Sequence, residues 1–221
     1  KHNGFIKVIT GVHKAEEGEM FLNGQKVDFK GPKDAQAAGI AAVYQHPTSY
    51  PHLTVAENIF MGHEIIKHHM IQWKEMNQEA NKYLKELDAD FDATAEMGTL
   101  SVAQQQMVEI AKALSTNAKI IILDEPTAML DPNGRKEVLE AVRELNRKEK
   151  VTVILITHYM EEVIHADRVY VMDSGNVVMQ GNPKEIFSQV DTLKAYGLDV
   201  PQVTLLAAGN RKEFSRQSFF M

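Results

Sequence analysis

The 221-residue sequence contains no cysteine, which excludes disulfide bonds, thiolate metal sites and cysteine nucleophiles. This absence suits a reducing cytoplasm. Long hydrophobic runs are also missing, because stretches such as residues 151–156 are far shorter than the roughly 20 residues of a membrane helix. Residues 1–4 lack the apolar core of a signal peptide. We therefore expect any association with a membrane to depend on a partner.

The chain also lacks an excess of positive charge. Its formal net charge is −6, which argues against nucleic acid as the main partner. Hydrophobic residues make up 44% and charged residues 24%, as is ordinary for a soluble globular protein. The length fits one large domain or two small lobes.

Strand and helix patterns alternate from residue 119 onward. Strands are predicted at 119–124, 151–156 and 168–173, and helices at 132–148 and 159–165. Such alternation indicates a parallel sheet with helices packed on it. The turn at 173–176 leads to a last predicted strand at 177–179, and short helices follow from residue 183.

The first half of the chain shows a different pattern. We predict a helix at 5–12, a hairpin at 19–29 around Asn23-Gly24, a helix at 33–38 and a strand at 40–44. Helices dominate residues 51–117, with one at 72–88 and two that begin with capping boxes at Thr54 and Ser101. We therefore expect an α/β lobe (1–50 and 118–206), an inserted helical lobe (51–117) and a tail (207–221).

Two adjacent acids, Asp124 and Glu125, follow an apolar run and precede a proline. Carboxylates at the end of a buried strand are costly unless a cation or a polar partner meets them. In phosphate chemistry the first acid of such a pair holds Mg²⁺ and the second polarises the attacking water. The alternative is a strand end with solvated acids, but the full string of residues 120–128 favours the nucleotide site.

That string, together with Leu100-Ser101-Val102-Ala103-Gln104 about twenty residues earlier, resembles the ATP-binding-cassette (ABC) ATPases. The resemblance implies a phosphate-loop NTPase-like fold, with Asp124 on Mg²⁺ and Glu125 as catalytic base. It also implies that Ser101 and Gln104 clamp an ATP held by a second subunit. A capped helix N-terminus suits a terminal phosphate, although a plain capping box is the other interpretation of the same residues.

Three more residues match the family's motifs. Gln45, after the strand at 40–44, resembles the glutamine that contacts Mg²⁺ and water and links the site to the membrane subunit. His158 resembles the switch histidine that contacts the γ-phosphate. Asp131 is predicted to cap a helix ahead of Pro132, and the resemblance also places it across a dimer interface; both roles are compatible.

Three other histidines, His63, His68 and His69, are interpreted as residues of a solvated loop. A metal site is the alternative, but no spacing places them with a carboxylate on one helical face.

The resemblance also points to importers. Residues 18–127 look like the ATPases of sugar importers, through the strings at 32–40, 54–62 and 100–113, and residues 128–206 look like those of energy-coupling-factor importers, through 129–135 and 196–203. Importers of this kind imply ATP and Mg²⁺ as cofactors. They also imply transmembrane permease subunits and a second ATP-binding subunit as partners, at the cytoplasmic face of the membrane. A non-catalytic partner subunit and a soluble ABC ATPase of DNA repair or translation are the alternatives; the importer-like strings and the acidic charge weigh against the latter.

One motif of the family is absent. No Gly-x-x-x-x-Gly-Lys-Ser/Thr phosphate loop occurs in the sequence, and residues 3–11 match the helix that follows that loop in relatives. We therefore expect the N-terminal strands of the family's sheet to be missing too. Charge-assisted hydrogen bonds contribute roughly 1.5–3 kcal/mol each, so losing three would weaken ATP binding by about 5–9 kcal/mol. We expect the chain alone to bind ATP poorly and to hydrolyse it negligibly.

Overall fold

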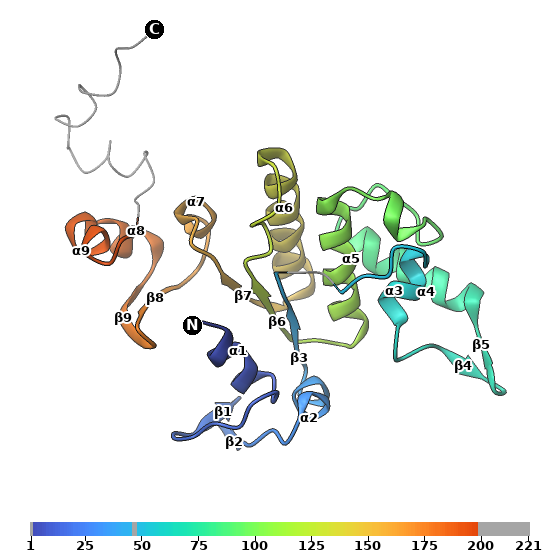
Figure 1. Cartoon of the computed structure of the whole chain (residues 1–221), viewed down its shortest axis with the longest axis horizontal. Helices are drawn as coiled ribbons and strands as arrows, with labels where there is room; N and C mark the ends of the chain where they lie inside the picture. The colour runs from blue at the N-terminus through green and yellow to red at the C-terminus, as the bar shows by residue number, and fades with distance from the viewer. Residues whose placement is uncertain (1, 46–47, 199–221) are drawn as a thin grey trace, which may run out of the picture. The chain divides into compact units, whose positions relative to one another are not determined.

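The structure, a computed structural model, describes residues 2–45 and 48–198 (Figure 1). It divides into two compact units, residues 2–156 and the residues from Thr157 on, and each is described here by itself. The first unit contains α1 (His2–Ile9), β1 (Met20–Leu22), β2 (Gln25–Val27), α2 (Pro32–Ala37), β3 (Ile40–Val43), α3 (Val55–Phe60), β4 (Ile66–Lys67), β5 (Met70–Ile71), α4 (Trp73–Glu86), the 3₁₀ turn η1 (Met97–Thr99), α5 (Val102–Ser115), β6 (Ile120–Asp124), α6 (Pro132–Glu149) and β7 (Thr152–Ile156). The second contains α7 (Met160–Val163), β8 (Val169–Asp173), β9 (Asn176–Gly181), α8 (Pro183–Phe187) and α9 (Val190–Ala195).

A parallel sheet of three strands, in the order β3-β6-β7, forms the centre of the first unit. Alternate side chains of the central strand β6 enter two different cores. Ile121 and Leu123 pack in the larger core with residues of α3, α4, α5 and α6. Ile122 packs in the smaller one with Ile6 of α1 and Ala35 of α2. The predicted α/β fold, with a parallel sheet and helices on both faces, is therefore confirmed.

The strand predicted at 168–173 does not join this sheet. β8 pairs antiparallel with β9, and within residues 2–45 and 48–198 it has no other strand partner. A two-residue turn, Ser174 (φ 50°) and Gly175 (φ 87°), brings the next strand back beside it. The strand itself is confirmed, but its expected parallel pairing was wrong: the tight turn brings β9 back beside β8, and the two pair antiparallel. Side chains of β8, β9, α8 and α9 form the core of this unit.

The first helix lies three residues earlier than predicted at both ends. α1 ends at Ile9, and the Thr10 hydroxyl donates back to the Ile6 carbonyl at 2.8 Å. Gly11 follows with φ 71°, and a Cβ atom there would lie 2.6 Å from the carbonyl oxygen of Gly31. Only glycine fits this position, so the chain turns there instead of continuing the helix.

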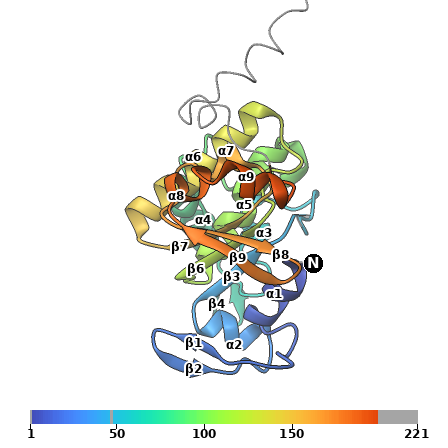
Figure 2. The same ribbon diagram turned by 90° about the vertical axis from the view of Figure 1, so that its left-hand side faces the viewer.

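The β1–β2 hairpin around Asn23-Gly24 is confirmed. It lies beside α2 at one end of the first unit in both views (Figures 1 and 2).

The helical segments were largely predicted correctly. The capping boxes at Thr54 and Ser101 begin α3 and α5, and α4 occupies most of the range 72–88. The short β4–β5 hairpin was missed. Its turn consists of His68 (φ 52°) and His69 (φ 63°), both of which are exposed.

The interpretation of His63 as a solvated loop residue was wrong. Its Nε2 atom lies 2.8 Å from the Ser115 hydroxyl, and its ring packs 5.4 Å from that of Phe60. Burial lowers the pKa of this histidine. No group of three or more metal-ligating side chains occurs in the part of the chain that the structure describes.

None of the described helices is long and apolar enough to cross a membrane. The division into an α/β lobe and an inserted helical lobe stays a prediction, and the predicted tail at 207–221 lies outside the described residues.

Candidate functional site

The acidic pair lies at the carboxyl end of the central strand. Asp124 ends β6 and is only 7% exposed. Glu125 follows with φ 47°, a conformation that is uncommon outside glycine. Its N–H donates to the Ile156 carbonyl at 2.9 Å, and its carbonyl accepts from the Ala128 N–H at 3.1 Å. These two bonds hold the chain in a sharp turn directly after β6.

Gln45 meets this turn from the neighbouring strand. Its side-chain Nε2 donates to Glu125 Oε2 at 3.3 Å, although the two residues are 80 positions apart. The parallel pairing of β3 and β6 explains the contact, because it brings the ends of both strands to the same edge. Gln45, which was expected to contact Mg²⁺, is thus in contact with Glu125, the expected catalytic base.

This edge fits a magnesium ion chemically. Asp124 is a buried carboxylate, which needs a cation or hydrogen-bond donors to compensate its desolvation. Carboxylate and amide oxygens are the ligands that Mg²⁺ prefers, usually together with water and substrate phosphates. Asp124 and Gln45 supply these atoms, and Glu125 lies beside Gln45.

His158 belongs to the second unit. The preceding residue, Thr157, accepts the Tyr159 N–H with its hydroxyl at 3.0 Å. The His158 ring lies 4.1 Å from the Tyr159 ring. Its contact with a γ-phosphate stays a prediction.

The first turn of α5 holds the predicted signature residues. The Ser101 hydroxyl accepts the Gln104 N–H at 3.2 Å, and the Ser101 N–H donates to Gln104 Oε1 at 3.0 Å. Gln104 Nε2 then donates to Asp90 Oδ1 at 2.9 Å. Because a carboxylate only accepts, Asp90 fixes which way the Gln104 amide points. Sequence reasoning missed Asp90, since no local pattern connects it with a residue 14 positions away.

A comparison with α3 shows what is unusual about this turn. α3 also begins with a capping box, but its next two N–H groups are used: Val55 donates to Ala95 and Ala56 to Ala93, both at 2.9 Å. In α5 the corresponding donors belong to Val102 and Ala103, and neither makes such a bond to a described residue. Free N–H groups at a helix N-terminus bind anions readily.

A groove of about 370 Å³ lies between the beginnings of α5 and α6. Asp131 caps α6 by accepting the Gly134 N–H at 3.0 Å, so its predicted capping role is confirmed. Gly134 permits a close approach, because a Cβ atom there would lie 3.0 Å from that of Ala103. The lining residues are Ser101, Val102, Ala103, Met129, Leu130, Asp131, Asn133, Gly134 and Glu137.

Comparison with known proteins identifies the class of this fold. Residues 4–128 match the family model described as "ABC transporter". A structure of cbiO1 from Clostridium perfringens, described as part of the ABC transporter complex cbiONQ, superimposes with a TM-score of 0.73 and 27% identity, over 93% of this chain and 82% of that one. The chain therefore has the fold of an ABC ATPase cassette.

Sequence relatives agree with this class. The energy-coupling factor transporter ATP-binding protein of Clostridium perfringens is 44% identical over 220 residues, which are 96% of this chain and 76% of the relative. The ribose import ATP-binding protein of Geobacillus kaustophilus is 41% identical over 183 residues, which are 81% of this chain and 37% of the relative. The chain belongs to the ABC transporter family. With two of its relatives, including the ribose import protein, the alignment covers only about two fifths of the relative's own length.

Proposed function

We propose that this chain is the ATP-binding subunit of an ABC importer that energises solute uptake. The observation that carries the proposal is the contact of Gln45 with Glu125 beside the buried Asp124. An amide and two carboxylates at the carboxyl end of a parallel sheet suit a metal–phosphate site. The relatives that import ribose or belong to energy-coupling-factor systems support the role in transport.

Each site residue receives a role in this proposal. Asp124 and Gln45 hold Mg²⁺, which would neutralise phosphate charge when bound. Glu125 accepts a proton from the attacking water. Ser101 and Gln104 face the ATP of a second subunit, and Asp131 lies at the interface between the two subunits. His158 contacts the γ-phosphate.

ATP binding by the chain alone is proposed to be weak. Its 221 residues contain no Gly-x-x-x-x-Gly-Lys-Ser/Thr motif, whose backbone N–H groups and lysine normally hold the phosphates. None of the roles above replaces that grip. The partners are then transmembrane permease subunits and a second ATP-binding subunit, at the cytoplasmic face of the membrane.

A second candidate function follows from the first turn of α5, where two backbone N–H groups have no acceptor among the described residues. The chain is then a non-catalytic subunit whose Ser101 and Gln104 complete a site whose phosphate loop lies on another chain. The N–H groups of Val102 and Ala103, which have no backbone acceptor among the described residues, favour this role, since binding through them does not require that the chain itself grip ATP.

An ATPase assay separates these functions. The chain is measured alone and mixed with an ABC ATPase that has its own phosphate loop. The first proposal predicts that the chain alone hydrolyses ATP negligibly and that Glu125→Gln abolishes whatever hydrolysis remains. Rapid hydrolysis that Glu125→Gln leaves unchanged would overturn it. The second predicts that Ser101→Arg lowers the activity of the mixture, whereas Gln78→Arg, which introduces an arginine at an exposed position of α4, does not.

The transported solute needs its own experiment. We propose a sugar, because residues 18–127 resemble sugar-importer ATPases; a vitamin or metal ion is the alternative, through the energy-coupling-factor resemblance of residues 128–206. Membrane subunits that co-purify with the chain are reconstituted into vesicles, and uptake of labelled ribose is compared with uptake of a labelled vitamin and a metal ion. ATP-dependent uptake of the vitamin or the metal ion alone would contradict the sugar proposal.

A further inference from the structure

The side-chain amide of Gln104 is engaged at both ends in the first turn of α5. Its Oε1 accepts the Ser101 N–H at 3.0 Å, and its Nε2 donates to Asp90 Oδ1 at 2.9 Å. Both polar atoms of the amide therefore have partners within the chain. The Gln104 side chain connects the cap of α5 with a residue outside the helix.

The capping box of α3 shows what happens when this connection is missing. There the Glu57 carboxylate accepts both the backbone N–H and the hydroxyl of Thr54, each at 2.7 Å. The hydroxyl hydrogen of Thr54 is thus used inside the cap. In α5 the Ser101 hydroxyl accepts the Gln104 N–H at 3.2 Å and donates to no described residue. Its hydrogen is left for a ligand outside the helix.

The bond to Asp90 accounts for this difference. Without it, the Gln104 side chain could rotate and present its oxygen to the Ser101 hydroxyl, as Glu57 does to the hydroxyl of Thr54. A carboxylate only accepts hydrogen bonds, so Asp90 binds the Nε2 end of the amide and restricts this rotation. The Ser101 hydroxyl therefore stays available.

Asp90 lies on an anchored loop between α4 and η1. Leu87 before it is 1% exposed and Ala93 after it is fully buried. Asn81 of α4 accepts the Ala93 N–H with its Oδ1 atom at 2.9 Å. Asp90 itself is exposed. Its carboxylate is thus a fixed point at the surface, and a substitution there does not disturb the core.

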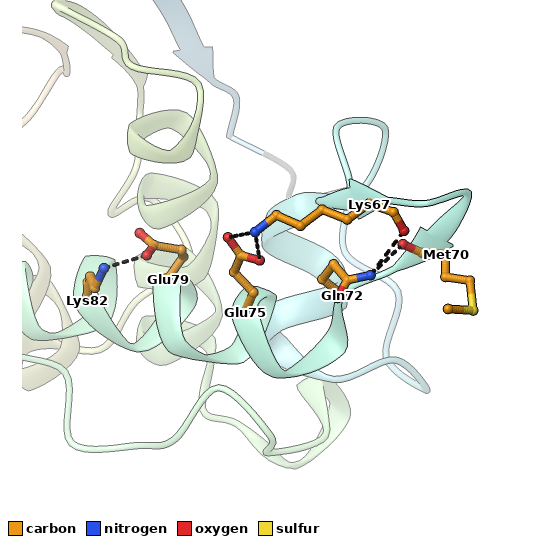
Figure 3. A network of polar contacts seen from close by, with 6 residues as sticks. All are labelled: Lys67, Met70, Gln72, Glu75, Glu79 and Lys82. Carbon is orange, nitrogen blue, oxygen red and sulfur yellow. Dashed lines mark hydrogen bonds and ion pairs between the residues drawn. The ribbon is translucent and has the colours of Figure 1, made fainter.

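Gln72, at the beginning of α4, shows another way in which this chain fixes a glutamine amide (Figure 3). Its Nε2 donates to the backbone carbonyls of Lys67 and Met70, at 3.3 and 3.0 Å. A substitution of either residue keeps the carbonyl acceptor. The acceptor of Gln104 is instead a side chain 14 positions away. One substitution of Asp90 therefore releases the amide and leaves the backbone as it is.

We propose that Asp90 is a positioning residue for the first turn of α5: it holds the Gln104 amide so that the Ser101 hydroxyl stays available to the terminal phosphate of an ATP on a second subunit. The inference rests on the proposed function, in which Ser101 faces that ATP, and adds a residue that does not itself touch the nucleotide. Charge alone has the opposite effect, because a carboxylate near a phosphate weakens binding. Loss of Asp90 strengthens ATP binding if charge dominates and weakens it if positioning dominates.

The first measurement uses the full chain alone, without nucleotide. NMR spectra record the side-chain amide signals of Gln104, assigned through Gln104→Glu, which lacks them. Asp90→Ala should move these signals to the positions of a solvent-exposed amide, whereas Asp90→Asn, which keeps an oxygen acceptor, should leave them nearly unchanged. Glu96→Ala is the matched control. It removes the same charge from the same loop, but the Glu96 carboxylate lies 3.7 Å from His52 Nδ1 and makes no contact with Gln104.

The second measurement is the ATPase rate of the chain mixed with an ABC ATPase that has its own phosphate loop. Asp90→Ala should raise the ATP concentration for half-maximal rate about tenfold, the lower limit for one hydrogen bond to a charged group. The rate at saturating ATP should stay the same, because a lost binding contact changes KM and not kcat. Asp90→Asn should bring the ATP requirement back to within about twofold of the wild type. A merely structural role of Asp90 would instead lower the maximal rate.

Four results would overturn the proposal. They are unchanged Gln104 signals in Asp90→Ala, a lower ATP requirement in that variant, equal effects of Asp90→Ala and Asp90→Asn, and equal effects of Asp90→Ala and Glu96→Ala. Failure of the proposed function gives a different pattern. Ser101→Arg then leaves the mixture unchanged while the Gln104 signals still respond to Asp90→Ala. That pattern would overturn the role of Asp90 at a phosphate together with the proposed function, although the orientation of the amide would stand.

Discussion

Two helices of this protein, α3 and α5, begin with the same local motif but present different surfaces. Thr54 and Glu57 form the capping box of α3, and Ser101 and Gln104 that of α5. The backbone of residues 93–95 covers the first turn of α3 and accepts two of its N–H groups. The first turn of α5 borders a groove, and the N–H groups of Val102 and Ala103 make no such bonds to described residues. A capping box thus marks where a helix begins, and its surroundings decide whether that beginning can bind a ligand.

The largest effect expected from this difference concerns stability. Thr54 is partly buried, and its hydroxyl also donates to Glu57 Oε2 at 2.7 Å. Thr54→Ala should therefore lower the unfolding free energy by about 2 kcal/mol, near the upper limit for a cap. Ser101→Ala, at an exposed box, should cost about 0.5–1 kcal/mol. Urea denaturation measures both, and equal losses would contradict the comparison.

The packing behind the α5 groove gives the second prediction. A Cβ atom at Gly134 would lie 2.9 Å from Asp131 Oδ1 and 3.0 Å from the Cβ atom of Ala103. Gly134→Ala should therefore lower the unfolding free energy by about 1–1.5 kcal/mol, despite the better helix propensity of alanine. Gly4 in α1 is the matched control, because a Cβ atom there meets nothing within 4 Å. Gly4→Ala should raise stability by up to about 1 kcal/mol; a similar gain at Gly134 would show that α5 and α6 do not pack closely.

Local signals predicted the beginnings of elements well. Thr54, Ser101 and the Asp131-Pro132 pair each mark a helix start through hydrogen bonds within three residues, and each was found where expected. The contact of Gln45 with Glu125 was also predictable in outline, because parallel strands bring their carboxyl ends to one edge.

Other features depended on information that a local pattern does not contain. The β4–β5 hairpin has strands of only two residues and a His68-His69 turn without the usual glycine or asparagine. Asp90 reaches Gln104 only because the chain folds back between α4 and α5. Likewise, whether the N–H groups in the first turn of a helix find acceptors depends on distant backbone, as the contrast between α3 and α5 shows.

The third prediction separates the first turn of α5 from the body of the helix. Gln106 is 3% exposed, and its Nε2 atom has no hydrogen-bond partner among the described residues. Gln106→Met should raise the unfolding free energy by about 1 kcal/mol, because it removes an unsatisfied buried donor. Its neighbour Gln105 donates to the carbonyl of Leu100 at 3.0 Å, so Gln105→Met should lower stability by about 0.5–1 kcal/mol. Thermal unfolding of both variants checks this difference in sign.

The smallest effect is a pH dependence farther along α5. Burial raises the pKa of Glu109, and Lys112 opposes this shift. Between the pKa values of the unfolded and the folded states, the unfolded state holds fewer protons, so the unfolding free energy falls as pH rises through that window. Glu109→Gln removes this fall. It should stabilise the protein at pH 7 by about 0.5 kcal/mol and leave stability unchanged at acidic pH, where both states are protonated. An equal gain at both pH values, measured by urea denaturation, would show that packing and not charge limits this part of the helix.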